Sequence, residues 1–139
     1  MIVVYSSNES YARHLAVSMY SLFEQNKNCR KLAVYVLSLG LSEDSLKRLE
    51  KIGGQYGRDL VFAEMGDLKD RIRFQADTGA YDLSIMSRLF MGEMLPDSVE
   101  KVLYLDCDTV VAQPLGKLWN MDLEGNNIGA VMDPTIYQA

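Results

Sequence analysis

Four short, mostly apolar runs, separated by stretches with helical periodicity, constrain the fold of this chain more than any other feature. The runs cover residues 2–6, 32–39, 59–64 and 101–105. Their length and their content of β-branched and aromatic residues are typical of buried strands. Strands that alternate with helices predict an α/β fold, in which helices flank a mostly parallel sheet. Residues 127–132 predict a fifth strand.

The stretches between these runs predict helices. Residues 9–26 carry one apolar stripe at helical spacing. A second helix is expected to begin at Ser42, with two acids in its first turn, and to end at Gly53 and Gly54. A third is expected over residues 84–95. Residues 66–80 predict an irregular, charged connection between the second and third helices.

Composition narrows the class of function. The chain has 139 residues, enough for one domain with a real core, and a formal net charge of -5. A general nucleic-acid binder needs a basic face, so no nucleic-acid partner is expected. Cys29 and Cys107 have no zinc or disulfide spacing, which favours a reduced, cytoplasmic setting. The apolar N-terminal run is too short for a signal sequence or a transmembrane segment.

Ligands of open parallel sheets bind beyond the carboxyl ends of the strands. Four strand tips are therefore candidates for a site: Ser6 to Asn8, the loop after Leu39, Asp106 to Asp108, and Asp133. The acidic pair is the most informative of these, because apolar residues lead directly into it.

Asp106 and Asp108 are expected to point the same way, because side chains two residues apart in an extended chain share one face. Two such carboxylates repel each other unless a positive charge lies between them. Oxygen ligands of this kind suit Mn²⁺ or Mg²⁺, which also takes phosphate oxygens from a substrate. The alternative is ordinary turn chemistry, because Asp side chains also bond their own backbone at turns. The position after an apolar strand, late in an α/β chain, favours the metal interpretation.

Residues 102–111 are similar to the metal-binding segment of family 8 glycosyltransferases, the family of glycogenin and of bacterial lipopolysaccharide galactosyl- and glucosyltransferases. Further segments agree with this family in order and spacing. They are residues 2–8 with Tyr11, residues 37–49, residues 87–89 with Arg88, residues 114–123 with Leu118 and Trp119, and residues 128–133. The resemblance covers essentially the whole chain.

The resemblance implies a GT-A fold, a UDP-hexose donor (UDP-glucose or UDP-galactose), Mn²⁺ or Mg²⁺, and transfer with retention to a glycan or lipopolysaccharide-type, lipid-linked acceptor. It also implies residue roles. Tyr11 would stack on uracil while Ser6 and Asn8 line the base pocket. Cys107 would contact the ribose through its backbone, and Arg88 would approach the diphosphate and steady Asp106. The implied metal ligands are Asp106 and Asp108, and the residue implied to face the transferred sugar is Asp133.

The sequence departs from the family pattern in two ways. Many members carry an acidic residue where Asn8 stands, so the charge is lost there. Members are also roughly twice as long, and their second half supplies catalytic residues, a third metal ligand and most of the acceptor site. Residues 1–139 are therefore expected to be a truncated nucleotide-sugar-binding portion, with weak or no transferase activity alone and a possible tendency to form homo-oligomers.

Two alternatives stay open at this point. An apolar strand followed by Asp-x-Asp-x-Thr/Val also resembles the nucleophile segment of haloacid-dehalogenase-type phosphohydrolases, with Asp106 as nucleophile and Asp108 as acid/base. In that class the segment usually lies on the first strand, whereas here it follows three strands. The second alternative is a non-catalytic remnant that binds a nucleotide or a partner without chemistry.

Overall fold

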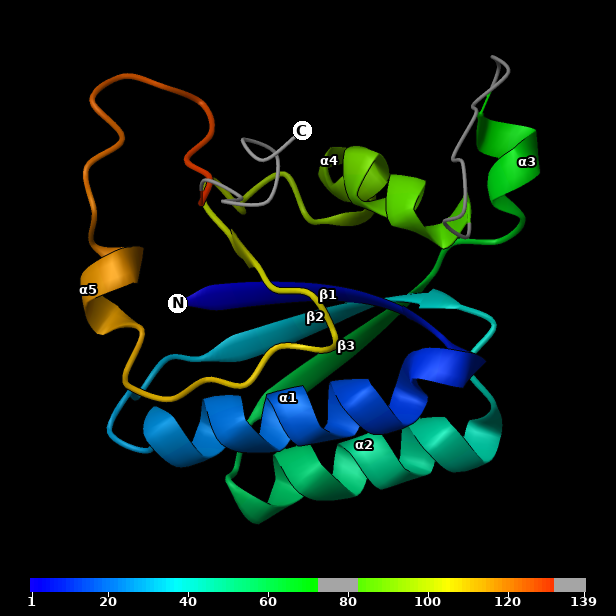
Figure 1. The fold of residues 1–139 in the computed structure, drawn as a ribbon, viewed down its shortest axis with the longest axis horizontal. Coiled ribbons are helices and arrows are strands. Elements are labelled where there is room, and N and C mark those ends of the chain that lie inside the picture. The colour runs from blue at the N-terminus through cyan, green and yellow to red at the C-terminus, as the bar shows by residue number, and fades with distance from the viewer. Residues whose placement is uncertain (73–82, 132–139) are drawn as a thin grey trace, which may run out of the picture.

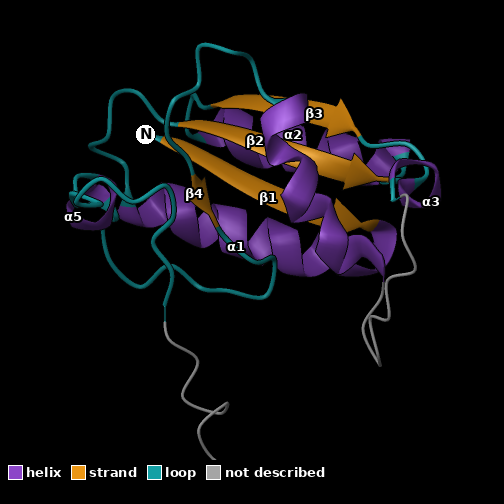
Figure 2. Ribbon diagram, turned by 90° about the horizontal axis from the view of Figure 1, so that it is seen from above, coloured by secondary structure: helices purple, strands orange, loops and turns teal. Residues whose placement is uncertain are grey.

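A four-stranded parallel sheet organises the chain. The computed structural model describes residues 1–72 and 83–131 (Figure 1). The strands are β1 (Ile2–Asn8), β2 (Ala33–Leu39), β3 (Asp59–Glu64) and β4 (Leu103–Tyr104). Their order across the sheet is β3-β2-β1-β4, and every neighbouring pair is parallel, as Figure 2 shows. The predicted α/β architecture with a parallel sheet is confirmed.

Helices cover both faces of this sheet. They are η1 (Glu9–Tyr11), α1 (Ala12–Gln25), α2 (Glu43–Gln55), α3 (Leu68–Arg71), η2 (Leu83–Phe90), α4 (Met91–Met94) and α5 (Gly116–Trp119), where η marks 3₁₀ winding. Figure 1 shows α1 and α2 on one face of the sheet, with η2 and α4 on the other. No helix within the described ranges combines the length and apolar character needed to cross a bilayer.

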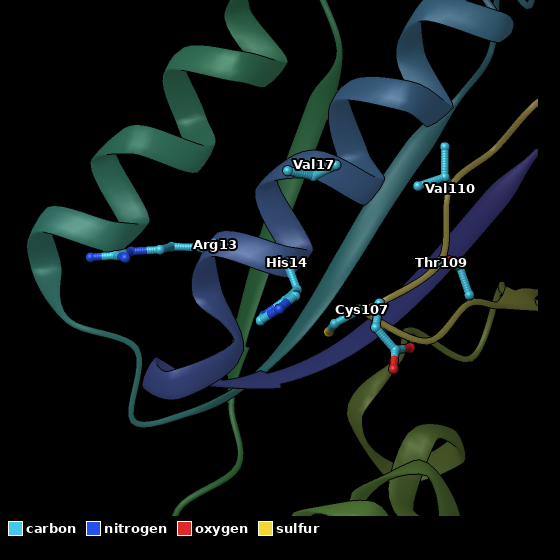
Figure 3. A pocket seen from close by; sticks show the side chains of 7 residues that line it. Arg13, His14, Val17, Cys107, Thr109 and Val110 are labelled. Carbon is cyan, nitrogen blue, oxygen red and sulfur yellow. The ribbon is translucent and has the colours of Figure 1, made fainter.

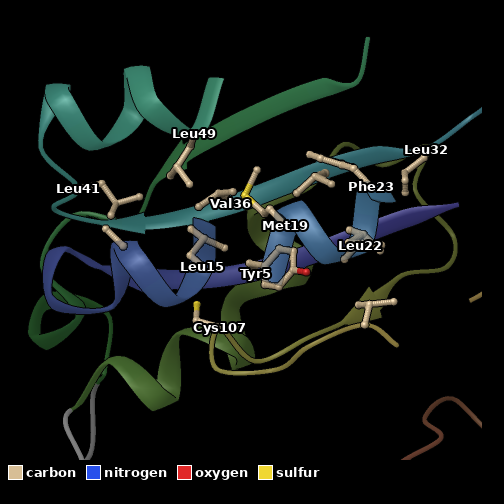
Figure 4. Packing of buried hydrophobic residues seen from close by; sticks show 14 residues of the cluster. Tyr5, Leu15, Met19, Leu22, Phe23, Leu32, Val36, Leu41, Leu49 and Cys107 are labelled. Atoms are coloured by element: carbon tan, nitrogen blue, oxygen red, sulfur yellow. The ribbon is translucent and has the colours of Figure 1, made fainter. Parts of the chain in front are cut away.

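The alternation of side chains along β1 divides the core between the two faces. Val3 and Tyr5 belong to the larger cluster, which packs against α1 and α2 (Figure 4). Val4 belongs to a smaller cluster, which includes Phe90 and Met94 on the opposite face. All three β1 side chains are fully buried. This central strand therefore fixes the positions of both helical layers.

The second helix begins where the sequence predicts, but it ends later. Ser42 is its N-cap, with Oγ accepting from the backbone N–H of Ser45 at 3.2 Å. The glycine pair does not end α2, which continues to Gln55. A Cβ on Gly53 would lie 2.4 Å from Leu60 Cδ1, so this glycine allows close approach of α2 to β3. Gly57, at φ +58°, makes the turn instead.

The third predicted helix is mostly 3₁₀ rather than α. Residues 84–95 were expected to form one α-helix, whereas 3₁₀ winding extends over Leu83–Phe90 and one α-turn follows in α4. Ser87 Oγ donates to Ser84 O at 2.6 Å, and Arg88 Nε donates to Ile85 O at 3.1 Å. Side-chain donors that bind carbonyls three residues back compete with the α-helical pattern, which accounts for the tighter winding.

The chain after β4 is largely irregular. Strand β4 has only two residues, although Leu105 N continues the ladder by donating to Val4 O at 3.0 Å. The fifth strand predicted over residues 127–132 is wrong for its described part, because residues 127–131 have no strand structure. Among the described residues no strand lies beside them to pair with, and Ile128 and Val131 are 81% and 94% exposed. Part of the irregular connection expected over 66–80 lies outside the described residues.

Candidate functional site

The strand order creates one point at which the direction of the chain crossovers reverses. From β1 the chain winds outward through β2 to β3, whereas β4 lies on the other side of β1. Loops diverge at such a switch point, so open α/β sheets bind ligands there, beyond the strand carboxyl ends. Asn8 ends β1 at this edge, and Asp106 follows β4 at the same edge.

A cavity of about 260 Å³ occupies this switch point. It is lined by the tips of β1 and β4, by η1 and by the first turns of η2. Seven of the eight predicted site residues surround it, namely Ser6, Asn8, Tyr11, Arg88, Asp106, Cys107 and Asp108. The eighth, Asp133, lies outside the described residues. The roles assigned to all eight stay predictions.

Residues 106–109 form a tight turn that does not use the acidic side chains. Thr109 satisfies the carbonyl of Asp106 twice, through its backbone N–H at 3.2 Å and its hydroxyl at 2.7 Å. The side chain of Asp108 has no hydrogen bond or ion pair within the described part of the chain. The hydrogen bonds of the turn therefore do not explain why acids stand at these two positions. Both carboxylates line the cavity.

Arg88 and Tyr104 form the wall beside Asp106. Arg88 Nη2 lies 2.9 Å from Asp106 Oδ1, and its guanidinium carbon lies 4.7 Å from the centre of the Tyr104 ring. The two charged side chains are 38% and 50% exposed, so water screens the pair, which contributes little to folding stability. Burial raises the pKa of Tyr104 to about 12, so its phenol stays neutral. The guanidinium of Arg88 thus places one positive charge next to the acidic pair.

The β1–α1 connection forms the opposite wall. Asn8 caps η1, with Oδ1 accepting from Ser10 Oγ at 2.7 Å and from Tyr11 N at 3.2 Å. Tyr11 is 47% exposed at the rim. Glu9 fixes this connection to α2, because its carboxylate accepts from Ser42 N at 2.7 Å and from Ser42 and Ser45 hydroxyls. The backbone bond from Ser42 is the main reason that the pKa of Glu9 lies below its usual value.

Comparison with known proteins gives the family. The family model of glycosyl transferase family 8 matches residues 2–139. The chain belongs to glycosyl transferase family 8.

Relatives of this family 8 chain agree. General stress protein A of Bacillus subtilis (strain 168) is 28% identical over 143 residues, covering 96% of this chain and 46% of the relative. A putative glycosyltransferase of Haemophilus influenzae is 25% identical over 136 residues, covering 98% of this chain and 40% of the relative. The chain thus spans less than half the length of these relatives.

Solved structures agree on the fold. A galactosyltransferase, LgtC, solved with donor and acceptor sugar analogues, has a TM-score of 0.76 and 28% identity. The match covers 88% of this chain and 43% of LgtC. WbbM, a bifunctional glycosyltransferase, has a TM-score of 0.70 and 25% identity over 88% of this chain and 21% of WbbM. The parallel sheet with flanking helices matches these structures, so the predicted GT-A type of fold is confirmed.

Membership of family 8 also decides between the two enzyme classes considered above. Asp106 follows the fourth strand, at the edge of the sheet, rather than the first strand. The family match extends over the whole described chain. Both observations favour the glycosyltransferase interpretation over a haloacid-dehalogenase-type phosphohydrolase.

Cys107 and Ser6 link the two strand tips internally. Cys107 is 6% exposed, and its Sγ donates to Ser6 O at 3.0 Å. The hydroxyls of Ser6 and Ser87 hydrogen-bond each other. Burial raises the pKa of Cys107 to about 11, so its side chain is a neutral thiol rather than a reactive thiolate. The Ser6 hydroxyl and the Cys107 thiol are therefore engaged in contacts within the protein. A ligand would contact the backbones of these two residues instead.

Sequence reasoning missed several cavity residues. Ser84, Ile85 and Tyr104 also line it, as does Ser7, which lies within the predicted tip Ser6 to Asn8 but was given no role. Tyr104 could have been found, because it precedes Asp106 by two residues and strand periodicity gives them a common face. Ser84 and Ile85 could not, because their approach to β1 depends on the 3₁₀ winding of η2.

A second cavity, of about 330 Å³, lies on the other side of the acidic turn. It is lined by α1 and by residues 107–110, and Figure 3 shows the His14 ring directed into this space. Cys107 and Asp108 border both cavities. The acidic turn therefore separates the two cavities, and Asp108 is accessible from both.

The acidic pair fits a hard divalent cation as a partial ligand set. Asp106 and Asp108 offer carboxylate oxygens, and Asp108 has no competing partner among the described residues. Those residues contain no cluster of three or more His, Cys, Asp or Glu side chains arranged to hold a metal. A cation here would complete its shell with water and ligand phosphate oxygens, which is how Mg²⁺ is usually held.

Proposed function

We propose that residues 1–139 form the nucleotide-sugar-binding portion of a metal-dependent, retaining glycosyltransferase that uses a UDP-hexose, UDP-glucose or UDP-galactose. Family 8 membership supports the reaction class, and the chain's coverage of under half of its relatives limits the proposal to donor binding. The hexose acceptor would be a glycan or a lipopolysaccharide-type molecule.

The observation that carries the proposal is the acidic pair at the switch point, in which Asp106 pairs with Arg88 and Asp108 has no partner among the described residues. Thr109 satisfies the turn, so neither carboxylate is needed to hold it. Asp106 and Asp108 line a cavity that also contains Arg88. A diphosphate carries several negative charges, and this set of groups binds such a charge only with a cation between the acids and the phosphates.

The residues around the cavity have separate proposed tasks. Asp106 and Asp108 would hold Mn²⁺ or Mg²⁺, which when bound neutralises the charge that develops on the leaving diphosphate. Arg88, held by Asp106 and the Tyr104 ring, would contact the diphosphate directly. Tyr11 offers an exposed aromatic face for a base to stack on.

Other tasks rest on the resemblance to family 8. The backbone of Cys107 would contact the ribose, Ser6 would line the base pocket, and Asp133 would face the transferred sugar. A cytoplasmic location and self-association are also proposed, the latter because large apolar side chains are exposed after β4, among them Val110 and Ile128.

The test is calorimetric titration of the chain with UDP, with Mn²⁺ and with EDTA. We expect Mn²⁺ to strengthen binding by at least about tenfold, equivalent to about 1.4 kcal/mol. Asp108→Asn should remove at least about tenfold of the affinity in Mn²⁺, because it removes a charged metal ligand. It should not lower the affinity in EDTA, because without metal the carboxylate only repels the diphosphate. UDP-glucose and UDP-galactose, titrated in the same way, give the hexose preference.

Asp122→Asn is the matched control, because Asp122 is an exposed acid that does not line the cavity and its Oδ1 serves only a local bond to Glu124 N. UDP binding that is equal in Mn²⁺ and EDTA would contradict the proposal. Hydrolysis of p-nitrophenyl phosphate would instead support the phosphohydrolase alternative. Metal-dependent UDP binding without hydrolysis of any UDP-hexose would favour the non-catalytic alternative for this chain alone.

A further inference from the structure

Ser87 joins η2 to the central strand from inside the core. Its side chain is fully buried and does not line the cavity at the switch point. Ser87 Oγ donates to Ser84 O at 2.6 Å and hydrogen-bonds the hydroxyl of Ser6. A hydroxyl has one proton, and the Ser84 carbonyl takes that of Ser87, so Ser6 donates and Ser87 accepts. The result is a directed chain of hydrogen bonds from β1 into η2.

Ser6 is also the junction between η2 and the acidic turn. Its hydroxyl donates to Ser87, the residue before Arg88. Its carbonyl accepts from the thiol of Cys107, the residue after Asp106, at 3.0 Å. One residue of β1 is thus bonded to a direct neighbour of each charged side chain. The relative position of Arg88 and Asp106 is therefore set through Ser6.

The ion pair itself is too weak to set that position. Arg88 and Asp106 are 38% and 50% exposed, and water screens pairs of this kind. Arg88 also donates from Nε to Ile85 O at 3.1 Å, but this bond lies within η2 and does not connect it to another element. A buried hydroxyl that loses its partner, by contrast, incurs the full desolvation penalty. The buried hydroxyl pair therefore holds η2 in place, and the exposed ion pair follows from it.

We propose that Ser87 is a positioning residue, which holds Arg88 beside the acidic turn through its buried hydrogen bond with Ser6. The inference rests on the proposed function in one respect, because it uses the assignment of Arg88 to the diphosphate. Ser87 itself touches neither ligand nor cation, so any effect of its substitution on binding passes through η2. Loss of its hydroxyl would let η2 shift and would leave the guanidinium less often within reach of the diphosphate.

Two variants break the same hydrogen bond from opposite ends. Ser87→Ala is the main variant, because Ser6 lines the cavity and Ser87 does not. Ser6→Ala takes its place if Ser87→Ala does not fold. Ser38→Ala is the matched control, because Ser38 is fully buried in β2, accepts from Leu41 N at 3.3 Å and does not line the cavity. Urea denaturation of each variant gives the conditions under which it is folded, and all measurements are made there.

The first measurement is titration of the folded variants with UDP in the presence of Mn²⁺. We expect Ser87→Ala to lose about threefold to tenfold in affinity, the range of one hydrogen bond, and Ser38→Ala to lose less than about twofold. Ser87→Ala combined with Arg88→Ala should bind UDP as Arg88→Ala alone does, within about twofold, because the hydroxyl acts through the guanidinium. An equal loss in both backgrounds overturns the inference, because the hydroxyl would then only stabilise the fold. Unchanged binding by Ser87→Ala overturns it as well.

The second measurement needs no ligand. It is the exchange of the Arg88 Nε proton with water, followed by NMR, with the signal assigned by its absence from Arg88→Ala. Exchange should be at least about threefold faster in Ser87→Ala and in Ser6→Ala than in the parent chain, and unchanged in Ser38→Ala. Equal exchange in the parent chain and Ser87→Ala overturns the inference. If the parent chain binds no UDP with Mn²⁺, the proposed function fails, and the exchange measurement alone then decides whether Ser87 positions Arg88.

Discussion

The region from β1 to β3 and the region after β4 are built on different principles. In the first, complete strands pair in register and bury side chains such as Val4 and Val36 entirely. In the second, pairing stops after two residues, and Val110 and Val131 are 68% and 94% exposed. The first region supplies a rigid framework, while the second supplies the acidic turn. The difference shows that this site is attached to a core rather than contained in one.

Polar side chains of α1 make that attachment. Ser18 Oγ and Thr109 Oγ1 lie 3.2 Å apart, Val111 N donates to Ser21 Oγ at 2.9 Å, and Leu115 N donates to Asn26 Oδ1 at 2.9 Å. The segment that follows the acidic turn therefore runs along α1, where side-chain acceptors replace a neighbouring strand. Without these contacts its backbone N–H groups would depend on water.

The largest expected effect on stability comes from a side chain in the core of the first region. Leu15→Ala should lower the free energy of unfolding by about 2–5 kcal/mol, because Leu15 is fully buried between α1 and the sheet. Ile128→Ala, in the exposed segment, should change it by less than about 0.5 kcal/mol. Urea denaturation followed by circular dichroism measures both. Equal losses for the two variants would mean that the second region is packed as tightly as the first.

A smaller effect is expected at the attachment itself. Asn26→Ala should cost about 1–3 kcal/mol, because Asn26 is buried and its loss leaves Leu115 N and Leu22 O without their side-chain partner. Asn126→Ala is the matched control, since Asn126 is exposed and bonds only Leu123 O. Hydrogen exchange should be faster at Leu115 in Asn26→Ala, because that amide loses its acceptor. Unchanged exchange at Leu115 would argue that the Asn26 side chain does not hold the segment.

The smallest expected effect concerns the one point where the acidic turn enters the core. Because burial raises the pKa of Cys107 from 9.0 to about 11, its thiol should resist alkylation at pH 8. In the Cys29→Ser variant the alkylation rate should rise as pH approaches 11. The folded state holds this proton more tightly than the unfolded state, so stability should decline as pH rises from about 9 to about 11.

The Cys107→Ala variant, which retains the partly exposed Cys29, provides the reference rate. Reaction of Cys107 at pH 8 as fast as that of Cys29 would show that the turn opens to solvent and is not anchored in the core.

Sequence periodicity predicted the first region well and the second poorly, for a physical reason. Residues 59–64 form a strand with the predicted bounds, because the local strand pattern agrees there with parallel pairing to β2 along the whole segment. The pattern of residues 127–132 is equally apolar, but a strand needs a partner, and partners are set by long-range pairing that local pattern does not encode. Local pattern also failed to predict the 3₁₀ winding of η2. That winding depends on hydrogen bonds from the side chains of Ser87 and Arg88 to backbone carbonyls three residues earlier.

At the candidate site, Asp106 and Asp108 were identifiable because chemistry and strand position coincide in the sequence. The ion pair of Arg88 with Asp106 joins residues 18 positions apart, and only the resemblance to family 8 suggested it. The double use of Asn8 Oδ1 was not predictable, because Asn8 was expected to line the base pocket and no capping role was assigned to it. A cap depends on backbone geometry at η1, which residue identity alone does not specify.

The way in which Thr109 closes the acidic turn has an evolutionary consequence. Since a hydroxyl and a backbone amide hold the loop, mutation at position 106 or 108 need not unfold it. Exchange of either acid would alter the proposed cation site while keeping the same scaffold. Selection on ligand binding and selection on folding can therefore act on different residues of a single four-residue segment.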